Sequence, residues 1–300
     1  MNGNVLTLIA RETAERWVAE ASAALERLGA RLGDTDWLAP GQACDIGFDG
    51  LDPDQAEAAV RSALTLGLDG PAVDVVVQSA AGRKKKLLVA DMESTIIENE
   101  MLDELAELIG LKDRVAAVTR QAMNDEIDFT TALKERVALF KGKPAALLDA
   151  AAAQIRPMPG AAALVATMRA NGAFTALVSG GFRVFSERVR LRLGFDRDFA
   201  NILVVDQGRL AGNVAEPILT RDGKLQILTS LAAEHGLSFS QTCAVGDGAN
   251  DLQMIGAAGL GVAFRSHPNV APRARHRIDH ADLTALLYVQ GYRRSEFVNG

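Results

Sequence analysis

Cysteine is scarce in this sequence, where Cys44 and Cys243 are the only two among 300 residues. Their separation matches neither a disulfide framework nor the closely spaced ligand pairs of a zinc site. We therefore expect a chain that folds without covalent cross-links in the reducing cytoplasm. Residues 1–5 also lack the basic and apolar regions of a secretory signal, which favours the same location.

Long hydrophobic runs and an excess of basic charge are absent as well. Charged residues interrupt every apolar stretch well before the roughly 20 residues that a membrane span requires. The formal net charge is -6, whereas a nucleic-acid-binding protein needs a basic surface to meet phosphate groups. The length and the 48% hydrophobic content suit a globular enzyme with one large domain and one smaller domain.

Several widespread catalytic motifs are missing from the chain. There is no G-x-x-x-x-G-K-S/T loop, no G-x-G-x-x-G turn after a strand and no G-x-S-x-G elbow. These absences argue against the usual nucleotide-binding loops and against a serine hydrolase of the α/β type. Four histidines have no metal-ligand spacing and are expected to be surface or structural residues: His235, His267, His276 and His280.

Residues 1–80 predict a small separate domain. The hydrophobic patterns indicate, in order, a strand at Val5–Ile9, a helix at Glu12–Arg31, strands at Trp37–Leu38 and Cys44–Phe48, a helix at Asp54–Leu66 and a strand at Val73–Gln78. This βαββαβ order is that of a ferredoxin-like domain. Because it holds no cluster of catalytic side chains, we expect a regulatory or oligomerising unit, with a homodimer as the candidate assembly.

The remainder of the chain predicts an α/β fold with a Rossmann-like parallel sheet. A short basic segment at residues 81–86 is expected to be a solvated linker. Helices then alternate with strand candidates at Leu87–Ala90, Phe174–Ser179, Ile202–Val205, Thr242–Gly246 and Leu260–Phe264. Helices are expected at Gly160–Ala170, Phe182–Leu193, Lys224–His235, Asn250–Ala258 and Asp282–Gln290. Between Asn99 and Gln154 only three or four amphipathic helices are expected, inserted where they would cover the carboxyl edge of the sheet.

Acidic residues follow two of the apolar strands. Asp91 and Glu93 come directly after Leu87–Ala90, and Asp247 and Asp251 follow the strand at Thr242–Gly246. Buried carboxylates are costly unless a cation or a reaction uses them. Either group alone could be an acidic turn or a helix cap. Together, at the carboxyl ends of two parallel strands, they predict a site of hard oxygen ligands that suits Mg²⁺.

Two further features could bind a phosphoryl group. Ser179 and Gly180 end a third strand, where a hydroxyl and free amide groups can donate hydrogen bonds to phosphoryl oxygens. Lys224 follows the turn at Asp222-Gly223, and its charge would balance an anionic site. Either feature alone is also compatible with an ordinary turn or a surface lysine.

In their order and spacing these motifs resemble the haloacid dehalogenase superfamily, and within it the phosphoserine phosphatase family. The similarity runs from about Lys85 to the end of the chain and is dense at Leu87–Glu100, Ala122–Gly142, Leu177–Phe182 and Ala244–Leu252. It implies a catalytic core at residues 85–98 and 156–300 with a helical cap at residues 99–155. Residues 1–80 are similar only in element order to the ACT-like, amino-acid-binding domains of some members.

The resemblance implies a role for each motif residue. Asp91 would be the nucleophile that forms an aspartyl-phosphate in a phosphoric monoester hydrolase. Mg²⁺ would be held by Asp91, the main-chain oxygen of Glu93 and Asp247, with Asp251 supporting the metal site and Lys224. The phosphate and the serine moiety would be bound by Glu100, Met123, Phe129, Arg136, Ser179, Gly180, Lys224 and Asn250. The implied reaction is hydrolysis of O-phospho-L-serine to L-serine, a step of serine biosynthesis.

Glu93 departs from the family pattern, which has an aspartate at this position. Glu93 would act as general acid and base, and its extra methylene moves the carboxyl group by roughly one ångström. Two alternatives therefore stay open. The protein could transfer the phosphoryl group from phosphoserine to an acceptor such as homoserine, or it could be a weakly active sensor of serine or phosphoserine.

Overall fold

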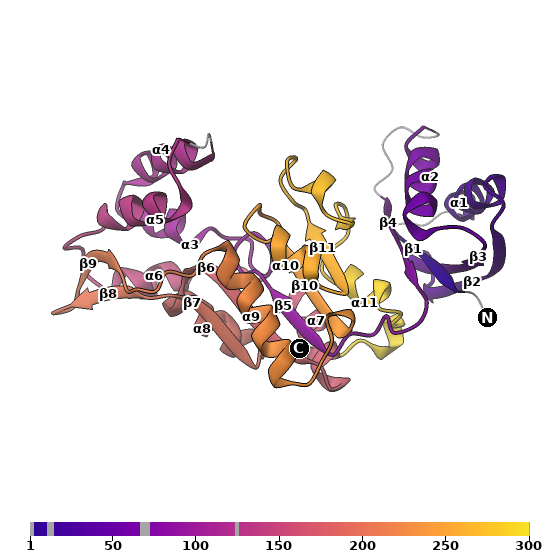
Figure 1. Ribbon diagram of the computed structural model, residues 1–300. Coiled ribbons are helices and arrows are strands. Elements are labelled where there is room, and N and C mark those ends of the chain that lie inside the picture. The colour runs from indigo at the N-terminus through magenta and orange to yellow at the C-terminus, as the bar shows by residue number, and fades with distance from the viewer. Residues whose placement is uncertain (1–2, 11–14, 67–72, 124–125, 300) are drawn as a thin grey trace.

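A six-stranded parallel sheet lies at the centre of the computed structural model, which describes residues 3–10, 15–66, 73–123 and 126–299 (Figure 1). The strand order is β12-β11-β10-β5-β6-β7. Their bounds are β5 Leu87–Ala90, β6 Phe174–Phe182, β7 Arg197–Asn201, β10 Thr242–Gly246, β11 Leu260–Phe264 and β12 His276–Ile278. The expected α/β fold with a parallel sheet core is thereby confirmed.

Helices cover both faces of this sheet. Leu87 and Val89 of β5 pack on α9 (Arg221–Glu234) and α10 (Leu252–Ala257), whereas Leu88 and Ala90 face the opposite side. That opposite face is covered by α7 (Ala161–Ala170), α8 (Arg183–Leu193) and α11 (Ala285–Val289). Burial on both faces explains why β5 is apolar at every position. Helix α9 begins before its expected start at Lys224, and α10 and α11 are shorter than expected at both ends, because the sequence pattern marks helix ends poorly.

Four helices follow β5, as expected for the inserted segment: α3 Met101–Glu107, α4 Lys112–Met123, α5 Phe129–Ala138 and α6 Leu147–Ala152. They lie beside a two-stranded hairpin of β8 (Leu203–Asp206) and β9 (Arg209–Val214) (Figure 1). The assignment of Ile202–Val205 to the parallel sheet was therefore wrong. The edge strand of that sheet is instead β7, whose sequence RDFAN lacks the apolar run of a central strand.

The amino-terminal elements form a separate four-stranded antiparallel sheet with the order β2-β3-β1-β4. The elements are β1 Asn4–Ala10, α1 Glu15–Arg27, β2 Arg31–Ala39, β3 Ala43–Asp49, α2 Pro53–Leu66 and β4 Val73–Ser79. Arg31 was predicted as the last helical residue but starts β2, because Gly29 reverses the chain with a φ of 87°. The predicted start of α1 at Glu12 lies outside the described residues.

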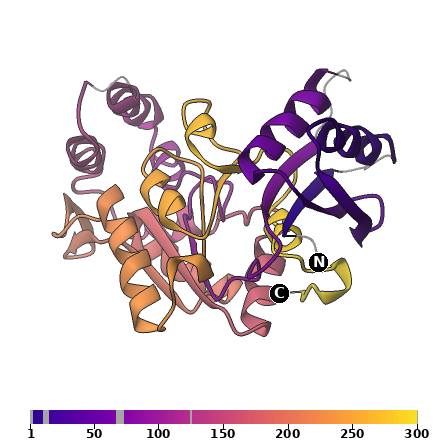
Figure 2. The same ribbon diagram turned by 45° about the vertical axis from the view of Figure 1, so that its right-hand side comes forward.

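One face of the amino-terminal sheet packs on α1 and α2, and its other face joins the core of the parallel-sheet unit. Ile9 and Val76 belong to the same buried cluster as Leu88, Leu287 and Val289. Figure 2 shows the amino-terminal sheet against the carboxyl-terminal part of the chain. No helix of the described residues has the length and apolarity needed to cross a membrane.

The basic segment between the two units is a solvated linker only in part, since Lys84 and Lys86 are exposed but Lys85 is buried. Lys85 is 6% exposed, and its ammonium group donates to the carbonyl oxygens of Gly82 at 3.0 Å and Ser240 at 2.9 Å. Burial lowers its pKa. Arg83 forms an ion pair of 2.5 Å with Asp45, which is also buried. Backbone carbonyl partners are invisible in a sequence, so these lysine and arginine side chains looked like surface residues.

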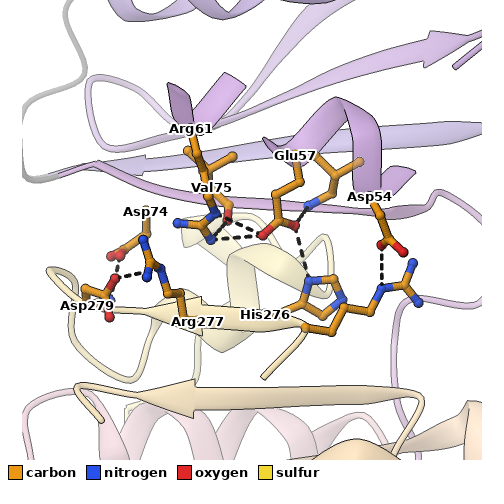
Figure 3. A network of polar contacts seen from close by, with 10 residues as sticks. Asp54, Glu57, Arg61, Asp74, Val75, His276, Arg277 and Asp279 are labelled. Atoms are coloured by element: carbon orange, nitrogen blue, oxygen red, sulfur yellow. Dashed lines mark hydrogen bonds and ion pairs between the residues drawn. The ribbon is translucent and has the colours of Figure 1, made fainter. Parts of the chain in front are cut away.

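A polar network joins α2 to β12 across the boundary between the two units (Figure 3). Glu57 lies 3.3 Å from His276 Nδ1 and 3.0 Å from Arg61, and it accepts a 2.9 Å bond from the amide of Val77. His276 is 3% exposed, so the structural interpretation of this histidine is supported. Burial alone would raise the pKa of Glu57, but His276 and Arg61 outweigh it and lower this pKa.

Glu57→Gln should destabilise the protein at pH 7 by about 1.5–3 kcal/mol, the usual worth of hydrogen bonds to a charged group. A glutamate whose pKa is lowered on folding stabilises the protein above the pKa of the unfolded chain, near 4.5. The stabilisation is lost as the pH falls through the lower pKa of the folded state. Denaturant unfolding between pH 3 and pH 8 measures this. A gap between wild type and variant that does not shrink on acidification contradicts the assignment, and exposed Glu26→Gln is the control.

Candidate active site

The carboxyl ends of β5 and β10 bring three carboxylates together. Ala90 pairs with Val245 in the parallel register, so Asp91 and Asp247 follow neighbouring strands at the same edge. Asp251 precedes the first residue of α10. One ligand oxygen from each of Asp91, Asp247 and Asp251 lies within 4.8 Å of the others, and all three residues are buried. The predicted convergence of the two acidic groups is present in the structure.

Lys224 lies between two of these carboxylates. Its Nζ atom is 2.6 Å from Asp91 Oδ1 and 2.6 Å from Asp251 Oδ1. The side chain is 1% exposed, although it sits on the first turn of α9 among residues that are largely accessible. Burial alone would lower the pKa of Lys224, but the charges of Asp251 and Asp91 outweigh it and raise that pKa. Lys224 is therefore a charged ammonium that links β5, α9 and α10.

The carboxylates remain under-compensated by this one lysine. Full ionisation of the three carboxylates would leave two negative charges in excess of the one ammonium. Burial raises the pKa of Asp91 well above its ordinary value, and the charge of Asp251 raises it further. Burial and Asp251 likewise raise the pKa of Asp247. A divalent cation with oxygen ligands fits this set in both charge and ligand chemistry.

Ser179 and its two glycines lie on β6, the strand beside β5. Ser179 is fully buried, and its hydroxyl oxygen accepts a 2.8 Å bond from the amide of Gly181. The ring of Phe129, at the start of α5, lies against Gly180. This contact places a residue of the inserted helices against the end of β6.

Glu93 reaches toward the cap helices. Its Oε1 atom accepts a 2.8 Å bond from the amide of Met101, the first residue of α3. A carboxylate at this position is stabilised by the unpaired amides at a helix N-terminus. Its Oε2 atom lies over Gly181, where a Cβ atom would come within 2.5 Å. Burial, followed by the charge of Glu100, raises the pKa of Glu93 to about 8.

Glu100, directly before α3, and Arg136 of α5 lie near the same carboxyl groups. Glu100 immediately precedes α3 without capping it, and its Oε1 atom accepts a 2.7 Å bond from the hydroxyl of Ser94. Removal from water raises the pKa of Glu100, and the charge of Arg136 opposes that increase. Arg136 also opposes the raised pKa values of Glu93 and Asp103. One guanidinium group thus lowers the pKa values of three carboxyl groups, those of Glu93, Glu100 and Asp103.

The positions of two other predicted residues, Met123 and Asn250, say little about their function. Met123 ends α4, and its side chain lies outside the described part of the structure. Asn250 folds back so that its Oδ1 atom lies over Gly248, where a side chain would clash with it. Neither contact tests the role that the resemblance implies for these residues.

Three residues near the site were not singled out from the sequence. Thr95 donates a 3.2 Å bond to Asp247 Oδ1, and Ser94 adopts a φ of 55° beside it. Both residues directly follow Asp91 and Glu93, and this position in the sequence could have marked them as site residues. His267 lies beyond β11, with its Nε2 atom 3.9 Å from Asp247 Oδ2. Only the sheet order places it there, so sequence spacing could not have found it.

Comparisons with known proteins agree with this geometry. A family model described as haloacid dehalogenase-like hydrolase matches residues 88–256. The chain is 41% identical over 226 residues to phosphoserine phosphatase SerB2 of Mycobacterium tuberculosis, covering 75% of this chain and 55% of that protein. The chain therefore spans only about half the length of that relative.

Solved structures extend the similarity to the fold. A HAD family hydrolase from Salmonella enterica serovar Typhi aligns with a TM-score of 0.84 and 28% identity, covering 95% of this chain and 97% of its own. A phosphoserine phosphatase solved as a phospho-aspartyl intermediate analogue has a TM-score of 0.64 and 36% identity, over 68% of this chain and 98% of its own. The first similarity includes the amino-terminal unit, and the second covers a smaller part of the chain.

Lys224→Met should destabilise the protein by about 3–5 kcal/mol, because it leaves Asp91 and Asp251 buried without their cation. Denaturant unfolding without added metal measures this. Addition of Mg²⁺ should recover part of the loss if the carboxylates bind a cation. The matched control is Lys134→Met, which removes a 2.8 Å ion pair with Glu216 at an exposed position. Equal effects of the two variants would show that the Lys224 pairs contribute no more than a surface contact.

Proposed function

The chain belongs to the haloacid dehalogenase-like hydrolase family, and we propose that it hydrolyses O-phospho-L-serine to L-serine and inorganic phosphate. The observation that carries this proposal is the buried set of Asp91, Asp247, Asp251 and Lys224 at the sheet edge. Relatives named as phosphoserine phosphatases favour this substrate over other phosphomonoesters.

In the first step, an Asp91 carboxylate oxygen attacks the phosphorus atom. The phosphorus–oxygen bond to serine breaks, and the phosphoryl group is carried as an aspartyl-phosphate. Lys224 holds Asp91 in place through the 2.6 Å ion pair and offsets charge on the phosphoryl oxygens. The Ser179 hydroxyl and the Gly180 amide would bind the non-bridging oxygens, with Asn250 assisting. These donors act where negative charge accumulates in the transition state.

Glu93 would move the protons. With a pKa of about 8, its carboxyl group is largely protonated at pH 7 and can donate to the departing serine oxygen. The resulting carboxylate then accepts a proton from the water that attacks the phosphorus and releases phosphate from Asp91. The bond from the Met101 amide stabilises the carboxylate form at this stage. The longer side chain is accommodated by the space above Gly181.

Mg²⁺ is the proposed cofactor. Asp91, Asp247 and the main-chain oxygen of Glu93 would hold it, with Asp251 supporting the site from behind. When bound, the cation would neutralise phosphoryl charge and keep the two anions close enough to react. Thr95 orients Asp247 through its 3.2 Å hydrogen bond.

Substrate choice is assigned to the cap. Glu100 would bind the ammonium group of serine and Arg136 its carboxylate, an arrangement in which the guanidinium group offers two parallel donors. Phe129 and Met123 would form the walls of this small pocket. The contact between Phe129 and Gly180 supports a cap that excludes water from the reacting groups.

The remaining assignments concern organisation. We propose residues 1–80 as a ferredoxin-like, ACT-like regulatory domain, residues 85–98 and 156–300 as the catalytic core, and residues 99–155 as its helical cap. The antiparallel sheet order and the helical segment α3–α6 support this division. A homodimer and a cytoplasmic location complete the proposal.

Asp91→Asn should reduce phosphate release from phosphoserine by at least about 10³-fold, because an amide cannot attack phosphorus. The variant should also fail to bind beryllium fluoride with Mg²⁺, an analogue of the aspartyl-phosphate. Asp222→Asn, on the exposed first turn of α9, is the matched control. Turnover at the wild-type rate by Asp91→Asn would refute the mechanism.

The same assay distinguishes hydrolysis from phosphoryl transfer to an acceptor alcohol. Phosphate released from phosphoserine should be unchanged by added homoserine if water is the acceptor. A new phosphoester formed while free phosphate stays at background would show transfer. No turnover of any kind in wild type, with activity recovered in Glu93→Asp, would indicate a sensor.

Arg136→Met should lower kcat/KM for phosphoserine by about 10²-fold or more, since it leaves the substrate carboxylate without its partner. Turnover of p-nitrophenyl phosphate, which has no such carboxylate, should change far less. Arg120→Met, on the exposed surface of α4, is the control. An equal loss for both substrates would show that Arg136 supports the cap rather than selecting phosphoserine.

A further inference from the structure

The turn at residues 279–281, just after β12, is held by a residue of the amino-terminal unit. Asp74 of β4 is 1% exposed. Its carboxylate accepts hydrogen bonds from three successive amides, at 2.7 Å from Asp279, 3.2 Å from His280 and 2.7 Å from Ala281. Figure 3 shows Asp74 reaching across the boundary toward Asp279. One buried side chain thus satisfies the whole amide edge of this turn.

Arg265 holds the same turn from the catalytic side. Its backbone amide donates to the carbonyl oxygen of Ile278 at 2.8 Å, and its guanidinium group donates to that of Ala281 at 3.1 Å. Arg265 has a φ of 42°, a left-handed conformation that non-glycine residues rarely adopt. Such a conformation persists where surrounding contacts hold it. The turn is therefore bonded to Asp74 through its amides and to the Arg265 side chain through the carbonyl group of Ala281, while the Arg265 amide bonds the end of β12.

Two residues beyond Arg265, the chain reaches the active site. The amide of His267 donates to the carbonyl oxygen of Asp247 at 3.3 Å, and its Nε2 atom lies 3.9 Å from Asp247 Oδ2. A continuous series of bonds thus connects Asp74 to the turn, the turn to Arg265, and the segment 265–267 to Asp247. The conformation of this segment determines where His267 contacts the backbone and the side chain of Asp247.

We propose that Asp74 is a positioning residue for the active site, which acts on Asp247 through the turn at residues 279–281 and through Arg265. Docking of the amino-terminal unit then orders the segment 265–267, and loss of that docking loosens it. The inference rests on the proposed function only in assigning Asp247 to the metal site. By this connection the amino-terminal unit would influence catalysis without binding a ligand itself.

Two other contacts across the boundary do not share this route. Asp54 forms a 3.1 Å ion pair with Arg275, but both side chains are more than half exposed and neither touches the turn. Gln78 donates to the carbonyl oxygen of Val289, the last residue of α11, which is not part of the turn. Asp54→Ala is therefore a matched control for Asp74→Ala: the same substitution, across the same boundary, away from the path.

The first measurement is hydrogen exchange in the full-length protein without metal or substrate. Asp74→Ala should accelerate amide exchange in peptides covering residues 265–281, including residues 265–267 beside Asp247. The second is Mg²⁺ binding by calorimetry, also without substrate. Asp74→Ala should weaken Mg²⁺ affinity by about 2- to 30-fold, the usual range for coupling between distant residues. Asp54→Ala should change neither quantity.

Arg265→Met tests the path from its other end and covers the case in which Asp74→Ala does not fold. It should weaken Mg²⁺ binding to a similar degree, with exposed Arg273→Met as its control. In the double variant the losses should be smaller than their sum, because both residues act through one turn. Additive losses would overturn the proposal.

Two other outcomes would also overturn it. Unchanged exchange at residues 265–267 in folded Asp74→Ala would show that the turn does not reach the site. Equal effects of Asp74→Ala and Asp54→Ala would reveal a general loss of docking rather than a specific path. Because exchange and metal binding are measured without phosphoserine, a wrong substrate assignment would leave these results interpretable and would show itself in the turnover assay alone.

Discussion

The ammonium group of Lys224, buried between Asp91 and Asp251, is the interaction on which the rest of the site depends. It joins the end of β5, the first turn of α9 and the start of α10 at one point. A buried charge is tolerated only with close partners, so separating any of the three elements would leave a buried charge without its partner. The same constraint leaves surplus carboxylate ligands beside Asp247, which is what makes the site suited to a divalent cation.

The central fold could be read from the sequence because its signals are local. The apolar run of β5 and the acidic residues that follow it identified both a buried strand and Asp91. Asp247 was found in the same way, at the end of β10. Parallel strands bring their carboxyl ends to one edge, so the convergence of the carboxylates needed no further information.

The structural features that the sequence did not predict depend on contacts between distant residues or on strands without a hydrophobic pattern. The edge strand β7 and the three-residue β12 are short and partly polar, so no hydrophobic pattern marks them. The burial of Lys85 depends on carbonyl groups far away in the sequence. The bonds that Asp74 makes with residues 279–281 join segments about 200 positions apart. Glu93 was recognised as unusual, but its bond to the start of α3 required coordinates.

The hairpin of β8 and β9 has a mechanical consequence for the cap. The amide of Gly142 donates to the carbonyl oxygen of Leu210, and the amide of Ala145 donates to that of Gly208. The segment after α5 is therefore hydrogen-bonded to the hairpin. Lys134 adds a 2.8 Å ion pair to Glu216 just beyond it. Because the hairpin directly follows β7 at the edge of the parallel sheet, the helical segment α3–α6 has an anchor besides its two covalent connections. Any movement of α5 away from Ser179 must therefore break these hydrogen bonds or bend the hairpin with it.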